Sequence, residues 1–260
     1  MAVIATAALL LFAPAALRAQ SSDGLPPSTT VVVPVVSSLS GLDDVRWVTS
    51  LELRNDTKTD VDVWLILPAA GDAPAYNMTL RGGQDVVMRD VMAEAFGAET
   101  ALSPLKIVTS GLRSVTIHAT VFGTRDGTVT AAQPIPIDYG PVPYGVVSLP
   151  GLSFSDAFRT NIGLVNLSES DSADFTLAVQ RLAGRSIAVS HIRVPPVTLV
   201  HTPVQSLFPT ITMGSDFTVV VECAQAGTYA YASVIQNGSS SARFVAPVVG
   251  FVGQDEETGP

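Results

Sequence analysis

Apolar and polar residues alternate in a nine-residue stretch that occurs twice along the chain. The copies span residues 47–55 and 158–166, at an offset of 111 positions (158 − 47), and both follow the pattern aromatic-x-Thr-x-aliphatic-x-Leu-x-Asn. Alternation with period two is typical of a half-buried β-strand. Each copy ends in an Asn, whose side chain can bond nearby backbone and begin a turn. We predict that Trp47 and Phe158 face the cores of two equivalent strands and that Val165 lies on the surface.

Further short strands and turn signals surround both copies. The predicted strands cover residues 61–67, 76–80, 85–88, 105–109 and 115–122 in the first half, and include residues 217–221 and 228–235 in the second. Residues 31–36 are rich in Val but contain Pro34, which lacks an amide donor and therefore predicts an edge strand or a strand entrance. No helical pattern of ten or more residues separates the strands, which disfavours a parallel α/β sheet. The chain is therefore predicted to be all-β, with two tandem antiparallel β-sandwich domains.

One short capped helix is expected in each half. In the first half Asp90 is a typical N-cap residue ahead of residues 91–96. In the second half Thr202 is expected to cap a helix that begins at Pro203 and ends at Phe208. Each helix carries one aromatic residue, and we expect it to close one end of a sandwich core.

Composition changes along the chain predict its domain organisation. Residues 1–19 are expected to be a signal peptide, because an uncharged apolar run leads to a small residue at position 19. An uncleaved membrane anchor is the alternative, which the shortness of the run disfavours. The remaining segments are a flexible lead-in (20–34), a first domain (35–140), a linker (141–145), a second domain (146–252) and an acidic tail (253–260). Because Pro- and Gly-rich linkers carry few contacts, we expect the domains to fold separately around separate cores.

Charge and cysteine content narrow the functional classes. The formal net charge is −9, which argues against binding to nucleic acid and against electrostatic docking to an anionic membrane. Cys223 is the one cysteine, so the chain has no internal disulfide, and we expect it to be a small half-buried residue rather than a nucleophile. The predicted signal peptide indicates a secreted protein, extracellular or periplasmic. A single cysteine is unusual for a secreted protein, and it suggests domains large enough to be stable without disulfides.

The second half resembles a repeat seen in secreted bacterial proteins of unknown function. The segments that carry the resemblance are residues 158–166, Pro195-Pro196 and residues 231–237. The similarity covers residues 146–250 well and residues 35–140 loosely. An Asp commonly precedes the final Asn of that repeat, whereas this chain has Gln236. The resemblance implies immunoglobulin-like sandwiches and an extracellular, non-enzymatic module, and it brings no known active site.

Three aromatic residues are candidates for binding. Trp64 points away from the apolar face of its predicted strand, and Tyr229 and Tyr231 share one face of theirs. Exposed aromatics on a sandwich can stack on sugar rings or anchor a protein partner. Packing between the halves is the more ordinary role for such residues. His118 occupies the position of Tyr231 in the first half, which favours the sheet surface for both.

The sequence contains weak metal-site candidates. Asp56, Asp60 and Asp62 lie in one acidic turn, but the turn lacks the Gly and the bidentate Glu typical of a calcium loop. The chain has three histidines, at positions 118, 191 and 201, and their spacing is not that of zinc ligands. We therefore predict no metal and no cofactor.

These patterns together predict a non-catalytic structural or adhesive module of the cell exterior. Its partner would be a cell-surface protein or a polysaccharide. A carbohydrate-binding module that uses Trp64 or the Tyr229/Tyr231 face is the alternative. A hydrolase with an unrecognised site is a second alternative, although no pair of nucleophile and base is visible in the sequence.

Overall fold

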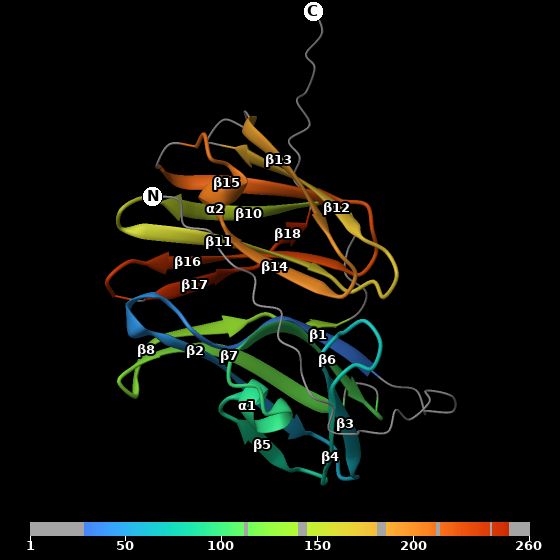
Figure 1. Ribbon diagram of the computed structural model, residues 1–260. Helices are drawn as coiled ribbons and strands as arrows, with labels where there is room; N and C mark the ends of the chain where they lie inside the picture. Colours follow the sequence, from blue (N-terminus) through green and yellow to red (C-terminus); the bar gives the residue numbers. More distant parts are fainter. Residues whose placement is uncertain are drawn as a thin grey trace, which may run out of the picture.

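The computed structural model describes residues 29–111, 114–139, 145–180, 186–211, 214–239 and 241–249. The predicted signal peptide and acidic tail lie outside these ranges, as do residues 20–28 of the predicted lead-in and residues 141–144 of the predicted linker. Strands dominate the described residues, and they are stacked in layers (Figure 1). Among the described residues, no helix is long and apolar enough to cross a membrane.

The first half (residues 29–139) forms one nine-stranded antiparallel sheet. Its strands are β1 (Thr29–Ser40), β2 (Arg46–Asn55), β3 (Val61–Ile66), β4 (Ala75–Leu80), β5 (Asp85–Met88), β6 (Ala101–Thr109), β7 (Val115–Arg125), β8 (Thr128–Ile135) and β9 (Asp138–Tyr139). A 3-10 turn (Leu42–Asp44) follows β1, and helix α1 (Val91–Phe96) follows β5. The strand order is β4-β3-β6-β1-β2-β7-β8, with β5 paired to β2 and β9 paired to β1.

The second half (residues 145–249) consists of two antiparallel sheets. Its strands are β10 (Gly145–Phe154), β11 (Phe158–Asn166), β12 (Ala173–Gln180), β13 (Ser186–Val194), β14 (Thr198–Pro203), β15 (Gly214–Cys223), β16 (Thr228–Gln236), β17 (Ala242–Val245) and β18 (Val248–Val249), and helix α2 (Val204–Leu207) follows β14. The sheet orders are β13-β12-β15-β10-β18 and β14-β11-β16-β17. Apolar side chains of both sheets form one buried cluster between them, so this half is a two-layer sandwich. The predicted all-β class is therefore confirmed.

The order of strand pairing is the same in the two halves. The set β4-β3-β6-β1-β9 corresponds in chain order to β13-β12-β15-β10-β18, and β5-β2-β7-β8 corresponds to β14-β11-β16-β17. The halves differ where Ser38–Ser40 of β1 also pair with Arg46–Val48 of β2. This additional pairing joins the two sets of the first half into a single sheet.

Strand β1 is central in its sheet, which corrects two expectations. Residues 29–34 belong to a strand and not to a flexible lead-in. Residues 31–36 do not form an edge strand, since β1 pairs with β6 on one side and, on its other side, with β9 at Val31 and Val32 and with β2 at Ser38–Ser40. Pro34 is accommodated at a register irregularity between Val33 and Val36. Residues 31–38 are buried on both faces of the strand, and this explains why the apolar run is continuous rather than alternating.

The two helices differ in how they begin. The side chain of Asp90 accepts a hydrogen bond from the amide of Ala93 at 3.1 Å, as predicted for α1. The predicted Thr202 cap of the second helix is wrong. Thr202 pairs with Ile162 in the sheet, so its backbone is extended, and α2 begins after Pro203 without a side-chain cap.

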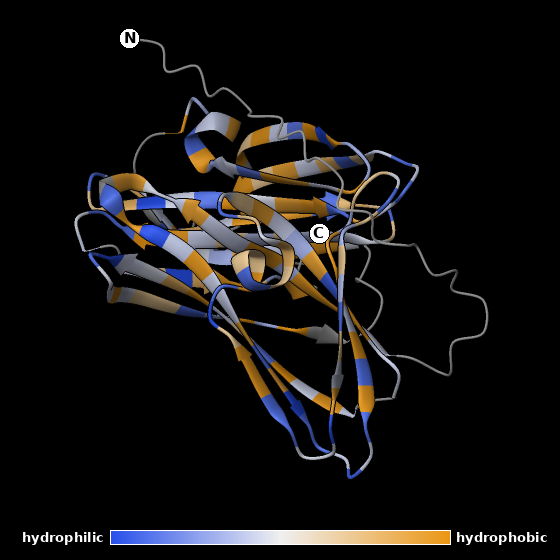
Figure 2. Ribbon diagram, turned by 60° about the horizontal axis from the view of Figure 1, so that its bottom comes forward, coloured by the Kyte–Doolittle hydropathy of each residue, from blue (hydrophilic) through white to orange (hydrophobic). Residues whose placement is uncertain are grey.

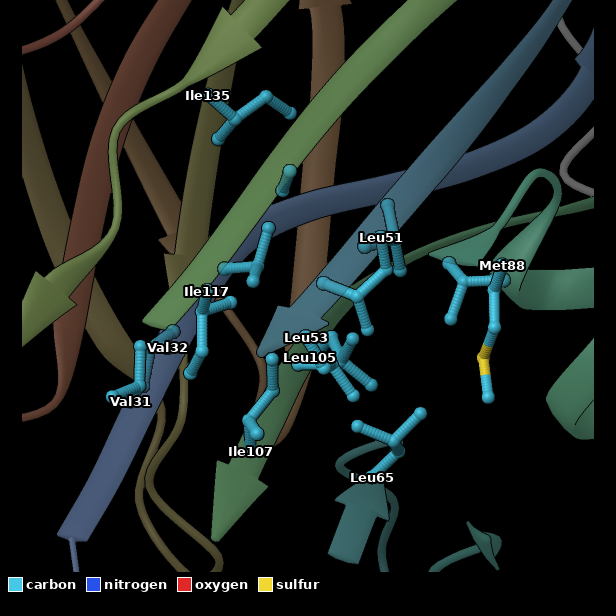
Figure 3. Close-up of a cluster of buried hydrophobic side chains, with 14 of the residues drawn as sticks. Val31, Val32, Leu51, Leu53, Leu65, Met88, Leu105, Ile107, Ile117 and Ile135 are labelled. Carbon is cyan, nitrogen blue, oxygen red and sulfur yellow. The ribbon is translucent and has the colours of Figure 1, made fainter. Parts of the chain in front are cut away.

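Apolar side chains from most strands of the first half converge in one buried cluster. Figure 3 labels ten of them, namely Val31, Val32, Leu51, Leu53, Leu65, Met88, Leu105, Ile107, Ile117 and Ile135. Along the strands of both halves, hydrophobic and hydrophilic residues tend to alternate (Figure 2). This alternation is the pattern that identified the strands in the sequence.

The halves are not separate cores joined by a linker. The outer face of the β14-β11-β16-β17 sheet lies against the first half (Figure 1), and this apolar contact is called the seam below. Its residues from the second half are Val165, Leu167, Leu199, Tyr229, Tyr231, Ile235, Ala242 and Phe244. Trp47 is buried as predicted, but it packs against Ile235 of the second half as well as Val45 and Ala131. The expectation of separate cores is therefore wrong.

The Asn that ends each repeated strand organises the following turn, as predicted. Asn166 is fully buried, and its Nδ2 donates to the carbonyls of Asp171 at 2.7 Å and Val194 at 3.1 Å. Its Oδ1 accepts from the amide of Ser168 at 3.0 Å. Asn55 makes the same kind of contacts in the first half. Each amide thus satisfies backbone groups that a strand end would otherwise leave unpaired.

We expect Asn166→Asp to destabilise the protein. The new carboxylate oxygen would face the carbonyls of Asp171 and Val194 and could not donate to them, at a cost of roughly 1–3 kcal/mol. Urea unfolding of the variant and the parent measures this difference. Asn77→Asp, on the exposed face of β4, is the matched control and should be nearly neutral. Equal stability of Asn166→Asp and the parent would contradict the proposed role of the amide.

Candidate functional site

The paired tyrosines of β16 lie inside the seam. Tyr229 is 7% exposed and Tyr231 is 1% exposed. The prediction that they share a face is confirmed, because both lie on the face opposite Ala230 and Ala232. Packing between the halves, the more ordinary of the two roles considered for them, is the one that the structure shows, since the first half covers this face; the alternative of an exposed binding face is wrong. They cannot serve as open stacking platforms for a sugar.

Tyr231 is held by close packing on several sides. It pairs in register with Gly163 of β11, and a Cβ placed on that glycine would lie 2.1 Å from the tyrosine ring. The ring also stacks on Phe244, with centroids 5.1 Å apart, and on His201, with centroids 5.9 Å apart. The hydroxyl is buried and has no hydrogen-bond partner among the described residues. Burial raises the pKa of Tyr231, so the phenol stays neutral.

Equivalent positions in the two halves differ in polarity, and this difference could have revealed from the sequence which outer face is buried. The outer face that is buried in the second half carries Gly163, Val165, Tyr229 and Tyr231, whereas the equivalent positions of the first half carry Glu52, Arg54, Thr116 and His118. The pairing registers match, because Gly163 pairs with Tyr231 as Glu52 pairs with His118. One outer face is therefore apolar and the other polar. This difference indicates that only the outer face of the second half is covered. His118 and Tyr231 occupy equivalent positions in different surroundings, so the expectation that both lie on the sheet surface is wrong for Tyr231.

His201 lies at the border of the seam on β14. His201 is an exposed residue, although its ring stacks on the buried Tyr231. Desolvation of the ring by the side chains packed around it lowers the pKa of His201 from 6.5 to about 4. The imidazole is therefore neutral in the folded protein at neutral pH.

The shifted pKa predicts a pH dependence of stability. Between pH 6.5 and about 4 the unfolded chain binds a proton at His201 and the folded chain does not, so stability falls as the pH falls through this window. Because the side chain also contacts solvent, we expect a shallower slope than for an enclosed histidine. His201→Phe keeps the ring and should reduce this slope, measured as thermal midpoint against pH. An unchanged slope in the variant would contradict the prediction.

The cavities near the seam are small. One of about 150 Å³ lies between the halves, and its lining includes Pro34, Pro136, Ile137, Tyr231, Phe244 and Pro247. A second of about 110 Å³ lies at the end of the second sandwich beside Cys223, which is buried. Pockets for sugars or drug-sized ligands usually measure about 300–1,000 Å³. Neither cavity has the size of such a site.

Trp64 is the remaining aromatic candidate. As predicted, it points away from the buried Val63 and Leu65, and it is partly buried on the outer side of β3. Its neighbours across the sheet are Asn77 and Val108. No second aromatic residue flanks it in register, so it offers a single ring and not a platform of rings.

In the structure, the carboxylates of Asp56, Asp60 and Asp62 each bond to a different protein group. Asp56 pairs with Arg54 at 3.0 Å and accepts from the hydroxyl of Thr116. The carboxylate of Asp62 accepts from the hydroxyl of Thr79, and Asp60 accepts from a backbone amide. Within the described ranges, no group of three or more His, Cys, Asp or Glu residues converges on one point. The acidic turn therefore does not present a ready calcium cage.

The outermost sheet exposes aliphatic side chains that the sequence analysis did not identify. Strand pairing aligns one transverse row across all five strands of the β13-β12-β15-β10-β18 sheet, formed by Val189, Ala178, Val220, Ser148 and Val248. Val189 is 56% exposed and Val248 is 48% exposed. Exposed aliphatic side chains that lie together mark a surface suited to protein contact. The sequence pattern predicts no strand at residues 173–180 or 186–194, so it does not reveal this row.

Comparisons with models of protein families, with curated proteins and with solved structures found no match to this chain.

Proposed function

We propose that this chain is a non-catalytic structural or adhesive module that acts outside the cell and binds a partner through its outermost sheet. The observation that carries the proposal is the row of small and aliphatic side chains from Val189 to Val248 on an exposed sheet face. The small volumes of the cavities near the seam add support, because they leave little room for a substrate.

The proposal includes two immunoglobulin-like sandwich modules that arose from one repeated unit. It is supported by the order of strand pairing, which the halves share apart from the additional β1–β2 pairing, and by the repeated strand pattern at residues 47–55 and 158–166. Secretion is part of the same proposal. Its support is the apolar run of residues 2–16, which contains no charged residue and leads to a small residue at position 19.

A protein partner fits this surface better than a polysaccharide. The row offers aliphatic groups, and sugar recognition usually relies on exposed aromatic rings. Tyr229 and Tyr231 are buried, which leaves Trp64 as the partly exposed aromatic for the carbohydrate alternative. Among the described residues, the hydrolase alternative has no group of three or more His, Cys, Asp or Glu residues in its favour.

Capture from a cell-envelope fraction by the immobilised full chain tests the proposal. Val248→Glu should abolish capture of an envelope protein, because a charge would be placed at one end of the row. Val87→Glu, at a similarly exposed valine on β5, is the control and should leave capture intact. Equal capture by both variants would overturn the proposed surface.

Two further measurements address the alternatives. Binding on a glycan array that Trp64→Ala abolishes would favour the carbohydrate-binding function. Turnover of ester or glycoside substrates by the purified chain would favour the hydrolase. Either result would replace the proposed function.

A further inference from the structure

The outermost sheet (β13-β12-β15-β10-β18) and the set β4-β3-β6-β1-β9 occupy equivalent places in the two halves. In β1, the two residues that pair with β9 are followed by a register irregularity that contains Pro34. In β10, the two residues that pair with β18 are followed by a register irregularity that contains Pro150. This correspondence makes Ser148 the equivalent of Val32 and Pro150 the equivalent of Pro34.

The second half covers this place on the first half. Side chains of a strand alternate between its faces, so Val32 lies on the outer face, opposite to Val31 and the inner core. Val32 is nevertheless only 6% exposed, and it belongs to the same buried cluster as Tyr229 and Tyr231. Pro34 lines the cavity between the halves together with both tyrosines. Strand β14 of the second half lies beside β6, whereas β4 lies away from the second half (Figure 1).

Among the described residues, the equivalent place on the second half is exposed. Pro150 is exposed, Ser148 is half-buried, and Val248 beside it is 48% exposed. Ser148 pairs with two valines, Val220 and Val248, whereas Val32 pairs with two charged residues of β6 and β9. The exposed place is therefore more apolar than the place that the second half covers, and it is suited to contact with a further protein module.

The face that covers the first half has a defined chemistry. It is the outer face of the β14-β11-β16-β17 sheet, where the ring of Tyr231 lies over Gly163. The equivalent face of the first half carries the charged Glu52 and Arg54, and burying these charges against aliphatic side chains would be costly. A second copy of this chain therefore cannot cover the exposed place with its first half. Its second half already uses the tyrosine face in the seam.

We propose that the partner of the outermost sheet is a β-sandwich module of another protein, which stacks on β10, β15 and β18 as the second half stacks on β1 and β6. This inference rests on the proposed function and names the chemistry of its partner. The partner presents an uncharged sheet face on which an aromatic ring lies over a glycine, as Tyr231 lies over Gly163. It contacts Ser148, Pro150 and Val248 and does not reach β13, because β13 is the equivalent of β4.

A graft onto the full chain tests whether the exposed place accepts such a face. Four substitutions give the outer face of the first half the residues of the face that covers it, namely Glu52→Gly, Arg54→Val, Thr116→Tyr and His118→Tyr. Val248→Glu in the same grafted chain blocks its own outermost sheet, so that it binds only through the grafted face. We expect this grafted chain to bind the parent chain, and sedimentation velocity of mixtures measures the dissociation constant.

Two matched substitutions in the parent chain locate the binding. Ser148→Glu places a charge in the covered surface and should raise the dissociation constant by about tenfold or more. Val189→Glu places the same charge on β13, at the far end of the same sheet, and should leave the constant unchanged. Equal effects of the two substitutions would overturn the inference, because the partner would then lie across the whole row.

A folded grafted chain that does not bind the parent would also overturn the inference. If circular dichroism shows that the grafted chain is unfolded, capture from the envelope fraction decides instead: Ser148→Glu should abolish capture and Val189→Glu should not. A captured protein that contains no β-sandwich module would contradict the inference while leaving the proposed surface intact. Binding of the grafted chain without capture of any envelope protein would support the docking geometry and contradict only the proposed function, so the two failures are distinguishable.

Discussion

Gly163→Ala is expected to be one of the most damaging single substitutions in this chain. A Cβ at this position would lie 2.1 Å from two atoms of the Tyr231 ring and 2.6 Å from its hydroxyl oxygen. The ring cannot move aside easily, because it is buried in the seam and stacked on Phe244 and His201. Overpacking a core typically costs about 1–3 kcal/mol, and we expect this clash to lie at or above the upper end. Chemical denaturation measures the loss.

The first half supplies a matched control for this substitution. Glu52 occupies the equivalent position, pairs with His118 and is exposed, so Glu52→Ala should change stability by less than about 0.5 kcal/mol. A double-mutant cycle with Tyr231→Ala isolates the contact, since without the ring the added methyl group has space. If Gly163→Ala costs as much in the Tyr231→Ala background as in the parent, the clash is not the cause.

Val165→Arg is expected to destabilise both halves together. Val165 is fully buried in the seam, and an arginine there would be a buried charge without a partner, at a cost of roughly 3–5 kcal/mol. Both tryptophans, Trp47 and Trp64, belong to the first half, so their fluorescence reports its unfolding. Because the halves share the seam, a substitution in the second half should lower the midpoint of the tryptophan transition. An unchanged tryptophan midpoint would show that the halves unfold independently.

The reciprocal change at the equivalent position of the first half completes this experiment. Arg54 is exposed and pairs with Asp56 at 3.0 Å and Asp85 at 3.7 Å. Exposed ion pairs contribute about 0–1 kcal/mol, so Arg54→Val should cost little. The contrast between the two swaps attributes the loss in Val165→Arg to burial in the seam. Equal losses would instead indicate that both outer faces are covered.

Local physical chemistry made several elements predictable from the residues. Period-two alternation identified the two repeated strands, because strand side chains alternate between faces whatever the rest of the chain does. Asn55 and Asn166 were predictable as turn-forming strand ends, and Asp90 as a helix cap, since each bonds backbone groups within a few residues or at the adjacent strand end. The shared face of Tyr229 and Tyr231 followed from the same alternation.

The predictions from sequence that proved wrong concern which surface covers a sheet face and which strands lie next to each other. Periodicity shows that Tyr229 and Tyr231 lie together, but their burial depends on the first half packing over them from a distant part of the chain. Pro34 suggested an edge, whereas β1 pairs with β6 through a register irregularity near Pro34 and with β9 and β2 on its other side. Thr202 suggested a helix cap, whereas its pairing with Ile162 keeps it in a strand.

The residues alone therefore established the all-β class, the positions of many strands and the sharing of strand faces, because these depend on contacts between near neighbours. The folded chain alone established the seam, the central place of β1 and the place of β13 at the end of its sheet. These features arise from pairings and packing between residues far apart in sequence. Hydrophobic burial has no direction, so an apolar face does not specify which surface will cover it.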